Sequence, residues 1–355
     1  MRLWIIALLA SGCGRIGFGP LADDPGELLP IAPFRLSELG LSTCIEMAWS
    51  GQDLAVFWVD LFDNRLRFAR VAPDGTTIVP ERLLGLADAF TCPAAVWTGT
   101  SYALAWSING GDIALGFVDT AGAETADLTV ALSPDNEALG SVAWDGNVIG
   151  VGYMNVTTMT TYFRAFAADA TPLGGAVAVT PGAYLGSMTA LATGGFALVQ
   201  GLASGAEYLE LGATGNPTTT PVVVAERPYG VHALARGPDQ FAVAYEALDF
   251  SATVRTGTPA LANPPYLLGL PQMIGADMVS LRDGFVLAWI EDTTGEYTPG
   301  ELRFTRLDAM GTPVTPIYHV ADGSSAVSMA ALDDTTLAIA FTEGNVPKLA
   351  VFQTP

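Results

Sequence analysis

The stretch MAWSGQDLAVFW, residues 47–58, is the first clear copy of a motif that recurs along the whole chain. The motif contains a large apolar anchor, a turn with Gly or Asp, and an alternating apolar run that ends in an aromatic residue. AVWTGTSYALAW (residues 95–106) and VAWDGNVIGVGY (residues 142–153) repeat it clearly, and fainter copies end at Gln200, Tyr245, Trp289 and Phe341. Successive copies end 48, 47, 47, 45, 44 and 52 residues apart. A period of this size, built from short strands, predicts a β-propeller.

Each copy predicts up to four strands in order. The first two flank the turn of the motif, as at residues 45–49 and 54–58, and the third is a second alternating run, as at residues 66–71. The fourth is less regular, as at residues 78–83. Repeat five is the weakest copy, because its third strand is reduced to residues 252–256. The regular spacing of the aromatic residues favours packing between blades over a carbohydrate-binding platform.

The two ends of the chain predict how the ring closes. The last repeat, from about Val327, offers three strands, and its fourth is missing. At the other end, PFRL (residues 33–36) resembles PERL (residues 80–83), the fourth strand of the first repeat, at an offset of 47 residues. A last blade completed by the N-terminal strand leaves no unpaired sheet edge. We therefore predict an all-β fold, a seven-bladed β-propeller closed by the N-terminal strand, with six or eight blades as alternatives.

The first residues have the pattern of a bacterial export signal. Arg2 supplies a positive start, and an apolar stretch too short to span a bilayer precedes small residues and Cys13. The run LLASGC resembles a lipobox, although Ala10 stands where Leu is commonest. This resemblance implies a signal peptide at residues 1–12 and a lipid on Cys13; an ordinary signal with an incidental Cys is the alternative. Residues 13–29 then form a tether, and residues 30–355 form the propeller domain.

The whole pattern is similar to the propeller-like repeat lipoproteins of myxobacteria, which carry a short start like GCGR, residues 12–15. The resemblance covers the signal and all repeats, but its motifs mark the scaffold and imply no reaction. It implies a protein that is exported and lipid-anchored in the bacterial cell envelope. Gly14, where some lipoproteins have Asp, implies the outer membrane.

Cys44 and Cys92 lie 48 residues apart, which is one repeat, and each stands five residues before an anchor Trp. Equivalent positions on neighbouring blades lie side by side, and an exported protein meets oxidising conditions. A disulfide between them is therefore predicted, with two buried free thiols as the alternative.

The charge balance is strongly acidic. The formal net charge is −21 and Lys348 is the one lysine. Nucleic acids are excluded as partners, because binding them requires clustered cations that neutralise phosphates. Such a chain suits solubility as a monomer and attraction of cations or basic partners.

Residues suited to catalysis are scarce. The chain has two histidines, His232 in the first strand of repeat five and His319 in the fourth strand of repeat six. His232 is expected near the central channel, where a structural role is the alternative to a catalytic one. No nucleophile-elbow, zinc-protease or phosphate-loop motif is present in the sequence. We therefore predict no catalytic residues, no metal ligands and no cofactor beyond a possible divalent cation.

Polar residues follow the second strand in several repeats. Equivalent positions in a ring open onto one face, so these residues predict an acidic rim around the channel mouth. Convergent carboxylates could bind a metal ion, a polyamine or a basic peptide. The alternative is that they only solvate loops. The predicted rim comprises Asp60, Asn155, Glu246, Glu291, Asp292 and Glu343.

The functional hypothesis is a non-enzymatic binding or interaction module of the cell envelope that uses one face of the ring. Its partner is expected to be an envelope protein, a basic peptide or a glycan, and Cys13 is expected to hold it at the membrane. Two alternatives stay open. One is a hydrolase or lyase acting on glycans or peptides at the channel mouth, and the other is a structural component of the envelope.

Overall fold

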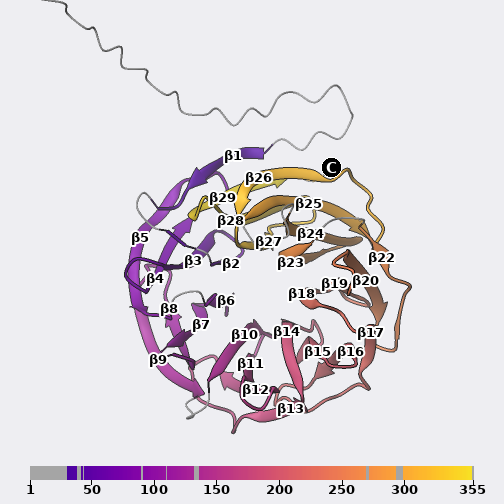
Figure 1. Cartoon of the computed structure of the whole chain (residues 1–355). Coiled ribbons are helices and arrows are strands. Elements are labelled where there is room, and N and C mark those ends of the chain that lie inside the picture. Colours follow the sequence, from indigo (N-terminus) through magenta and orange to yellow (C-terminus); the bar gives the residue numbers. More distant parts are fainter. Residues whose placement is uncertain are drawn as a thin grey trace, which may run out of the picture.

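The computed structural model describes residues 30–37, 41–42, 44–88, 91–108, 110–131, 136–268, 272–292 and 299–353. The predicted signal peptide, the lipidated Cys13 and the tether lie outside these residues. Within them the regular structure is entirely β-strand, in seven antiparallel sheets that surround a central channel (Figure 1). This part of the chain holds no helix long and apolar enough to cross a membrane.

Each sheet is one blade, and its strands run in chain order from the channel outward. Blade 1 contains β2 (Ile45–Trp49), β3 (Leu54–Asp60), β4 (Arg65–Val71) and β5 (Thr77–Leu86); blade 2 contains β6 (Ala94–Trp97), β7 (Tyr102–Ile108), β8 (Asp112–Val118) and β9 (Glu124–Ala131); blade 3 contains β10 (Glu137–Trp144), β11 (Val148–Asn155), β12 (Thr160–Ala167) and β13 (Val177–Pro181). Blade 4 contains β14 (Ala183–Ala190), β15 (Phe196–Leu202), β16 (Gly205–Leu211) and β17 (Val222–Ala225); blade 5 contains β18 (Gly230–Arg236), β19 (Phe241–Glu246), β20 (Ala252–Thr258), β21 (Leu261–Ala262) and β22 (Tyr266–Leu267); blade 6 contains β23 (Met273–Leu281), β24 (Gly284–Glu291), β25 (Gly300–Asp308) and β26 (Tyr318–Ser324).

Blade 7 closes the ring with strands from both ends of the chain. It contains β27 (Val327–Ala331), β28 (Thr336–Glu343) and β29 (Val346–Gln353), and its outermost strand is β1 (Pro30–Arg35). β1 pairs with β29 in antiparallel register, from Pro30 opposite Phe352 to Arg35 opposite Lys348. The predicted seven blades and their closure by the N-terminal strand are confirmed, and six or eight blades are excluded.

Blade 5 corrects one detail of the strand assignment. Its third strand, β20, spans seven residues and pairs fully with β19, so it is not the reduced strand that the sequence suggested. The irregular part is instead the outer edge, where two short strands, β21 and β22, both pair with β20. The fourth strand of a blade tolerates a wider range of residues than the inner strands, because only one of its edges is paired.

The core is divided among the interfaces between blades. Seven clusters of buried apolar residues lie one at each interface in the described part of the chain. Second strands are covered on both faces, so all seven residues of β3 are buried. The aromatic residues that end the motif copies pack there as predicted, and Trp58 and Trp289 are fully buried. This burial supplies most of the hydrophobic stabilisation, at about 25 cal/mol per Å² of apolar surface.

The ring has two different faces. On one, the segment that leads into each innermost strand bonds to the end of a second strand, as Leu61 N–H does to Leu41 O and Asp292 N–H to Gln272 O. We call this the mouth face. The opposite face carries tight turns between first and second strands, where Gly51, Gly99 and Gly146 have φ of 91°, 94° and 99°. Glycine recurs in the motif because this turn requires the left-handed region.

Candidate functional site

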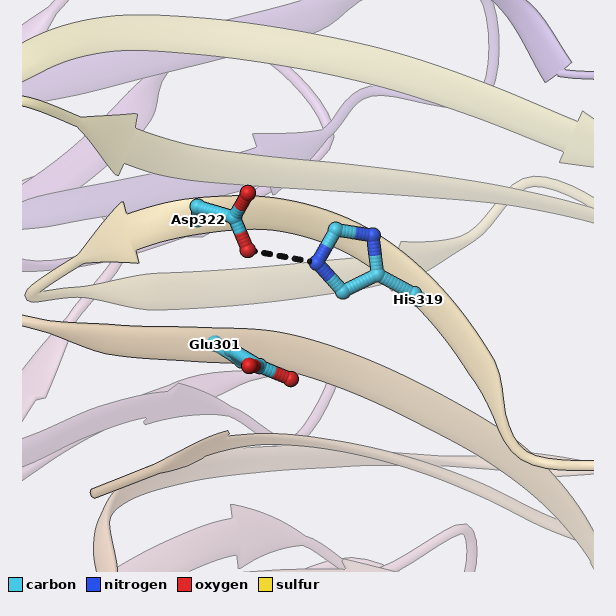
Figure 2. A group of neighbouring side chains, drawn as sticks. All are labelled: Glu301, His319 and Asp322. Carbon is cyan, nitrogen blue, oxygen red and sulfur yellow. Dashed lines mark hydrogen bonds and ion pairs between the residues drawn. The ribbon is translucent and has the colours of Figure 1, made fainter. Parts of the chain in front are cut away.

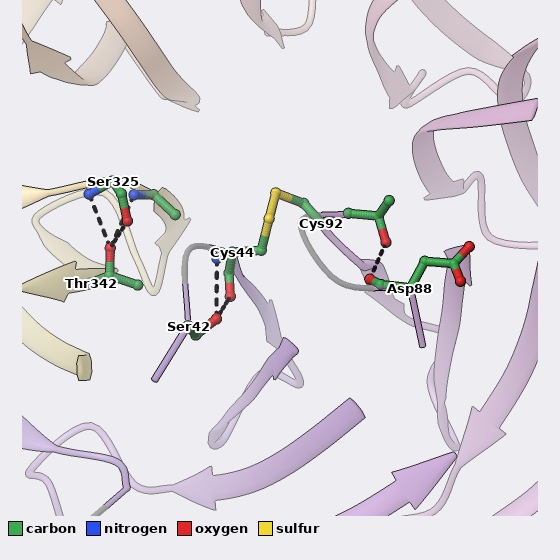
Figure 3. Close-up of a disulfide and its surroundings, with 8 residues drawn as sticks. Ser42, Cys44, Asp88, Cys92, Ser325 and Thr342 are labelled. Atoms are coloured by element: carbon green, nitrogen blue, oxygen red, sulfur yellow. Dashed lines mark hydrogen bonds between the residues drawn. A yellow bond between two sulfur atoms is a disulfide. The ribbon is translucent and has the colours of Figure 1, made fainter. Parts of the chain in front are cut away.

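A disulfide joins blades 1 and 2 on the mouth face (Figure 3). Cys44 and Cys92 stand just ahead of β2 and β6, with their Cα atoms 4.8 Å apart. Hydrogen bonds hold the segments around it: Ser42 Oγ accepts the N–H of Cys44 at 3.1 Å, and Thr91 Oγ1 donates to Asp88 O at 2.8 Å. The bond therefore fixes the segments leading into two neighbouring strands of the channel wall.

The structure places the six predicted rim residues on the mouth face, at or one residue beyond the ends of second strands. They are less open than the rim hypothesis assumes. Asp60, Asn155, Glu246, Glu291 and Asp292 are buried, and only Glu343 is partly exposed. The reason is that the segment leading into the innermost strand of the same blade bonds across the end of the second strand, as Val156 N–H does to Asn136 O.

Most rim residues have local partners. Arg67 Nε lies 3.0 Å from Asp60 Oδ2. Arg303 Nε lies 2.7 Å from Glu291 Oε2, and Lys348 forms an ion pair with Glu343. In blade 3, Asn155 Oδ1 accepts the N–H of Thr158 at 2.9 Å. These contacts stabilise the hairpin ends, and a binding role for the rim stays a prediction.

The central channel contains a cavity of about 980 Å³. The innermost strands of all seven blades line the cavity, together with mouth-face residues such as Asp88, Cys92 and Gly110. Among the described residues, no turn of the opposite face contributes to the lining. Its charged lining consists of acids, Glu46, Asp88, Glu137 and Asp277, and includes neither Lys nor Arg. The cavity therefore opens toward the mouth face and has a negative potential.

Hydrogen bonds from side chain to backbone link successive innermost strands around this channel. In blade 1, Glu46 Oε1 accepts the N–H of Ala95, the neighbouring blade's residue, at 3.4 Å. The equivalent residues of blades 3, 6 and 7 accept from their next blades in the same way: Ser141 from Met188 at 3.3 Å, Asp277 from Met329 at 2.6 Å, and Ser328 from Met47 at 3.1 Å. One register position thus supplies the acceptor in four blades.

Two of these acceptors are carboxyl groups in unusual surroundings. Burial, and next to it the charge of Asp277, raises the pKa of Glu46 to about 8. Burial also raises the pKa of Asp277 to about 6, against the N–H groups of Met329 and Met278 that hydrogen-bond to it. Each of the two carboxyls therefore keeps its proton to a higher pH than an ordinary carboxyl does. Neither Glu46 nor Asp277 is among the residues predicted from the sequence.

A second titratable pair lies nearer the mouth. His232, on β18, lines the channel as predicted, and its Nε2 lies 4.0 Å from Glu246 Oε2. Burial lowers the pKa of His232 to about 4 and raises the pKa of Glu246 to about 7, although the N–H of Met273 bonds to that carboxyl. His232 Nε2 and Glu246 Oε1 are both buried, and neither atom has a hydrogen-bond partner among the residues that the structure describes. Buried polar atoms in folded proteins are usually hydrogen-bonded, so the pair is unusual in this respect.

A third cluster lies on the outside of blade 6 (Figure 2). One ligand atom from each of Glu301, His319 and Asp322 lies within 4.8 Å of the others. His319 Nε2 is 2.8 Å from Asp322 Oδ1, and Arg303 Nη2 donates to Glu301 Oε2 at 2.5 Å. A metal ion would compete with Arg303 for Glu301. Because β25 and β26 are the outer strands of the blade, this cluster lies apart from the channel.

The half-buried acid at Glu46 makes the stability of the fold depend on pH. A carboxyl whose pKa is raised to about 8 in the folded state stabilises the fold fully below its usual value of 4.5 and loses that contribution as the pH rises through 8. Glu46→Gln keeps the shape of the protonated acid. We expect it to match the wild type at pH 5 and to be more stable at pH 9 by about 2 kcal/mol, since one pKa unit is worth about 1.4 kcal/mol and water in the lumen screens part of it. Thermal unfolding across this pH range measures the difference; parallel curves would contradict the assignment.

The comparisons with known proteins concern the fold. No protein-family model and no curated protein matches the chain. Solved structures similar to it include a mutant of AofleA from Arthrobotrys oligospora, 13% identical with a TM-score of 0.55 over 84% of this chain and 91% of that one. The Dos1 propeller is 9% identical, with a TM-score of 0.55 over 92% and 95%. A chain of the mitotic checkpoint complex is 10% identical, with a TM-score of 0.59 over 100% and 99%. At these identities the likeness establishes the propeller architecture alone.

Proposed function

We propose that this protein is a binding module that captures a positively charged ligand at the mouth face of its ring. The observation that carries the proposal is the channel of about 980 Å³, open toward that face and lined by four acids with neither Lys nor Arg. Low-dielectric walls of one charge sign concentrate the opposite charge, so such a channel attracts cations. The net charge of −21 acts in the same direction.

The surroundings of the mouth support a partner larger than a single ion. Connections between second and third strands place apolar side chains in solvent on this face. Phe62 in blade 1 is 75% exposed and Leu248 in blade 5 is 61% exposed. Tyr229 and Phe250, also exposed, pack ring to ring with centroids 4.9 Å apart. Apolar groups around an acidic opening suit a basic peptide segment or an envelope protein that presents one.

The location belongs to the same proposal. The export signal and lipobox at residues 1–13, with the resemblance to myxobacterial repeat lipoproteins, support a protein anchored through Cys13 in the bacterial envelope, at the outer membrane. A cation-binding ring in that place would hold basic peptides or polyamines near the membrane surface.

The experiment is a titration of the mature chain with organic cations at low ionic strength. Spermidine, a lysine amide and an arginine amide are the probes, and glutamate is the anionic control. We expect heat and a raised melting temperature with at least one cation, and weaker affinity as salt increases. No response to any cation would overturn the proposal.

The rim acids are tested on the same ligand. We expect the double variant Glu291→Gln and Glu343→Gln to lower affinity about two- to fivefold at low salt, because these charges attract cations from a distance although Arg303 and Lys348 engage them. Isothermal titration measures the change. An affinity equal to that of the wild type at low salt would exclude the rim from the site.

A further inference from the structure

We propose, on the basis of the proposed function, that the channel holds an alkylammonium group between the carboxyls of Glu46 and Asp277. These residues stand in blades 1 and 6, on either side of blade 7, whose Ser328 also interacts with Glu46. The ligand class is a primary amine on an alkyl chain, as in a diamine or a lysine side chain.

The other blades show that the ring does not need acids at the position of Glu46 and Asp277. Hydrogen bonding between innermost strands needs only an acceptor, and Ser141 provides one with a neutral hydroxyl. At the same register position, blades 2 and 5 have Ala94 and Ala233 and still pair into the ring. Scaffold geometry therefore does not require a carboxyl at Glu46 or Asp277. Glu46 and Asp277 are half-buried in the wall of one cavity, and the charge of Asp277 acts unfavourably on an ionised Glu46. A cationic ligand compensates this repulsion.

Two buried polar side chains near the same mouth, those of Glu246 and His232, have an atom with no hydrogen-bond partner among the described residues. Glu246 is only 1% exposed and its Oε1 has no hydrogen-bond partner. Its neighbour His232 lines the channel with an unpartnered Nε2. In blade 5 the position equivalent to Glu46 and Asp277 is Ala233. His232 precedes it in the strand and therefore lies closer to the mouth face than the two acids do. Of the two residues His232 lines the cavity, so an amine-bearing ligand that enters the channel passes beside its imidazole.

The geometry favours an ammonium group over a metal ion. A metal requires several ligand atoms within a few ångströms of one another. In the parts of the chain that the structure describes, Glu301, His319 and Asp322 are the one group of three candidate ligand residues that meets this spacing, and the channel acids are not part of it. An ammonium group donates three hydrogen bonds that can reach acceptors further apart.

The lining also suits the methylene chain of such a ligand. On the mouth side of the two acids, Pro93, Leu139 and Val327 face the cavity. A methylene chain can therefore lie on apolar surface while its charged end reaches the acids. Neutral ligands of the same length lack the interaction with Asp277.

Binding should depend on pH, because the ammonium group favours the ionised acids. Asp88, Glu137 and His232 also face the lumen. Burial raises the pKa of Glu46 to about 8, so this carboxyl keeps its proton to a higher pH than an ordinary carboxyl does. Affinity is therefore expected to rise between pH 6 and pH 8, with proton release on binding.

The test uses isothermal titration of the mature chain with 1,4-diaminobutane and with a lysine amide. Asp277→Asn and Glu46→Gln preserve side-chain shape, and each is expected to weaken binding about tenfold or more. Asp283→Asn, in a turn of blade 6 on the opposite face, removes the same charge outside the cavity and is expected to leave affinity within about twofold. Melting temperatures confirm that each variant folds.

The outcomes separate this inference from the proposed function. If the wild type binds an amine and the channel variants bind it equally well, the ammonium site is wrong while a cation-binding ring still stands. If no organic cation binds, both fail. A third outcome is that the wild type binds zinc or calcium but no amine, and that Asp277→Asn abolishes the metal binding. That outcome would show that the channel site holds a metal ion and not an ammonium group. Tighter binding of the diamine would indicate a free polyamine as the ligand, and tighter binding of the lysine amide would indicate a lysine side chain. Either result supports an ammonium site in the channel.

Discussion

A chain that lacks residues 1–37 will fail to close its ring. Without β1, the outer edge of β29 loses its pairing from Pro30 to Arg35 and exposes free backbone groups. Phe34 is also removed, and with it a contact to the turn at Gly75 in blade 1. We expect stability to fall by more than about 4 kcal/mol, with dimers or aggregates forming through the open edge.

The matched control is a chain that lacks only residues 1–29 and keeps β1. It should unfold at the same temperature as the longer protein and stay monomeric by size-exclusion chromatography. A synthetic peptide of residues 30–37 added to the shorter chain should restore part of the lost stability, because it can add as a strand to the open edge. Equal melting temperatures of the two truncated chains would show that β1 does not close the ring.

The double variant Cys44→Ser and Cys92→Ser should lose about 2–4 kcal/mol of stability. The cross-link encloses a loop of 48 residues, and a loop of this length restricts the unfolded chain by about 4 kcal/mol in the chain-entropy account. The loss is large because the bond joins two blades, so its removal lets blade 1 separate from blade 2 at the mouth face. Urea unfolding measures the change.

Reduction supplies the control for this prediction. A reductant should lower the stability of the wild type to that of the double variant and should leave the variant unchanged. Equal stability of the oxidised wild type and the variant would contradict the prediction. The variant also reports on function, because Cys92 lines the channel and its loss is expected to loosen the mouth.

Repetition explains why the architecture could be predicted. A strand that recurs seven times is recognised even when single copies are faint, and the fragment at residues 33–36 identified the closing strand by its likeness to residues 80–83. Blade 5 was misjudged because β20 (ATVRTGT) alternates polar and apolar residues without the aromatic that marks other third strands. Its pairing with β19, and not its composition, makes it a full strand.

The candidate site was predicted only in part. His232 was expected near the channel and lies there, and the rim residues end second strands as expected. Glu46 and Asp277 were missed because other blades have a small residue at this position, such as Ala94, Ser141 or Ser328, so no acid recurs with the period of the motif. Their proximity depends on ring closure, which brings residues 231 positions apart to neighbouring parts of one wall. The ion pairs that arginines form with rim acids were also not predicted. They depend on the register of the hairpin between second and third strands, which cannot be read from the spacing of the repeats.

The direction of β1 gives the whole ring an orientation. Pro30 pairs beside Phe352, near the end of β29 that reaches the opposite face, and Arg35 pairs beside Lys348, near the start of β29 at the mouth face. The chain therefore joins the ring from the side away from the channel opening. If Cys13 carries the proposed lipid, the ring is attached through Pro30, at the edge of the face opposite the acidic opening. The strand that closes the propeller therefore also sets the point at which the proposed anchor joins the ring.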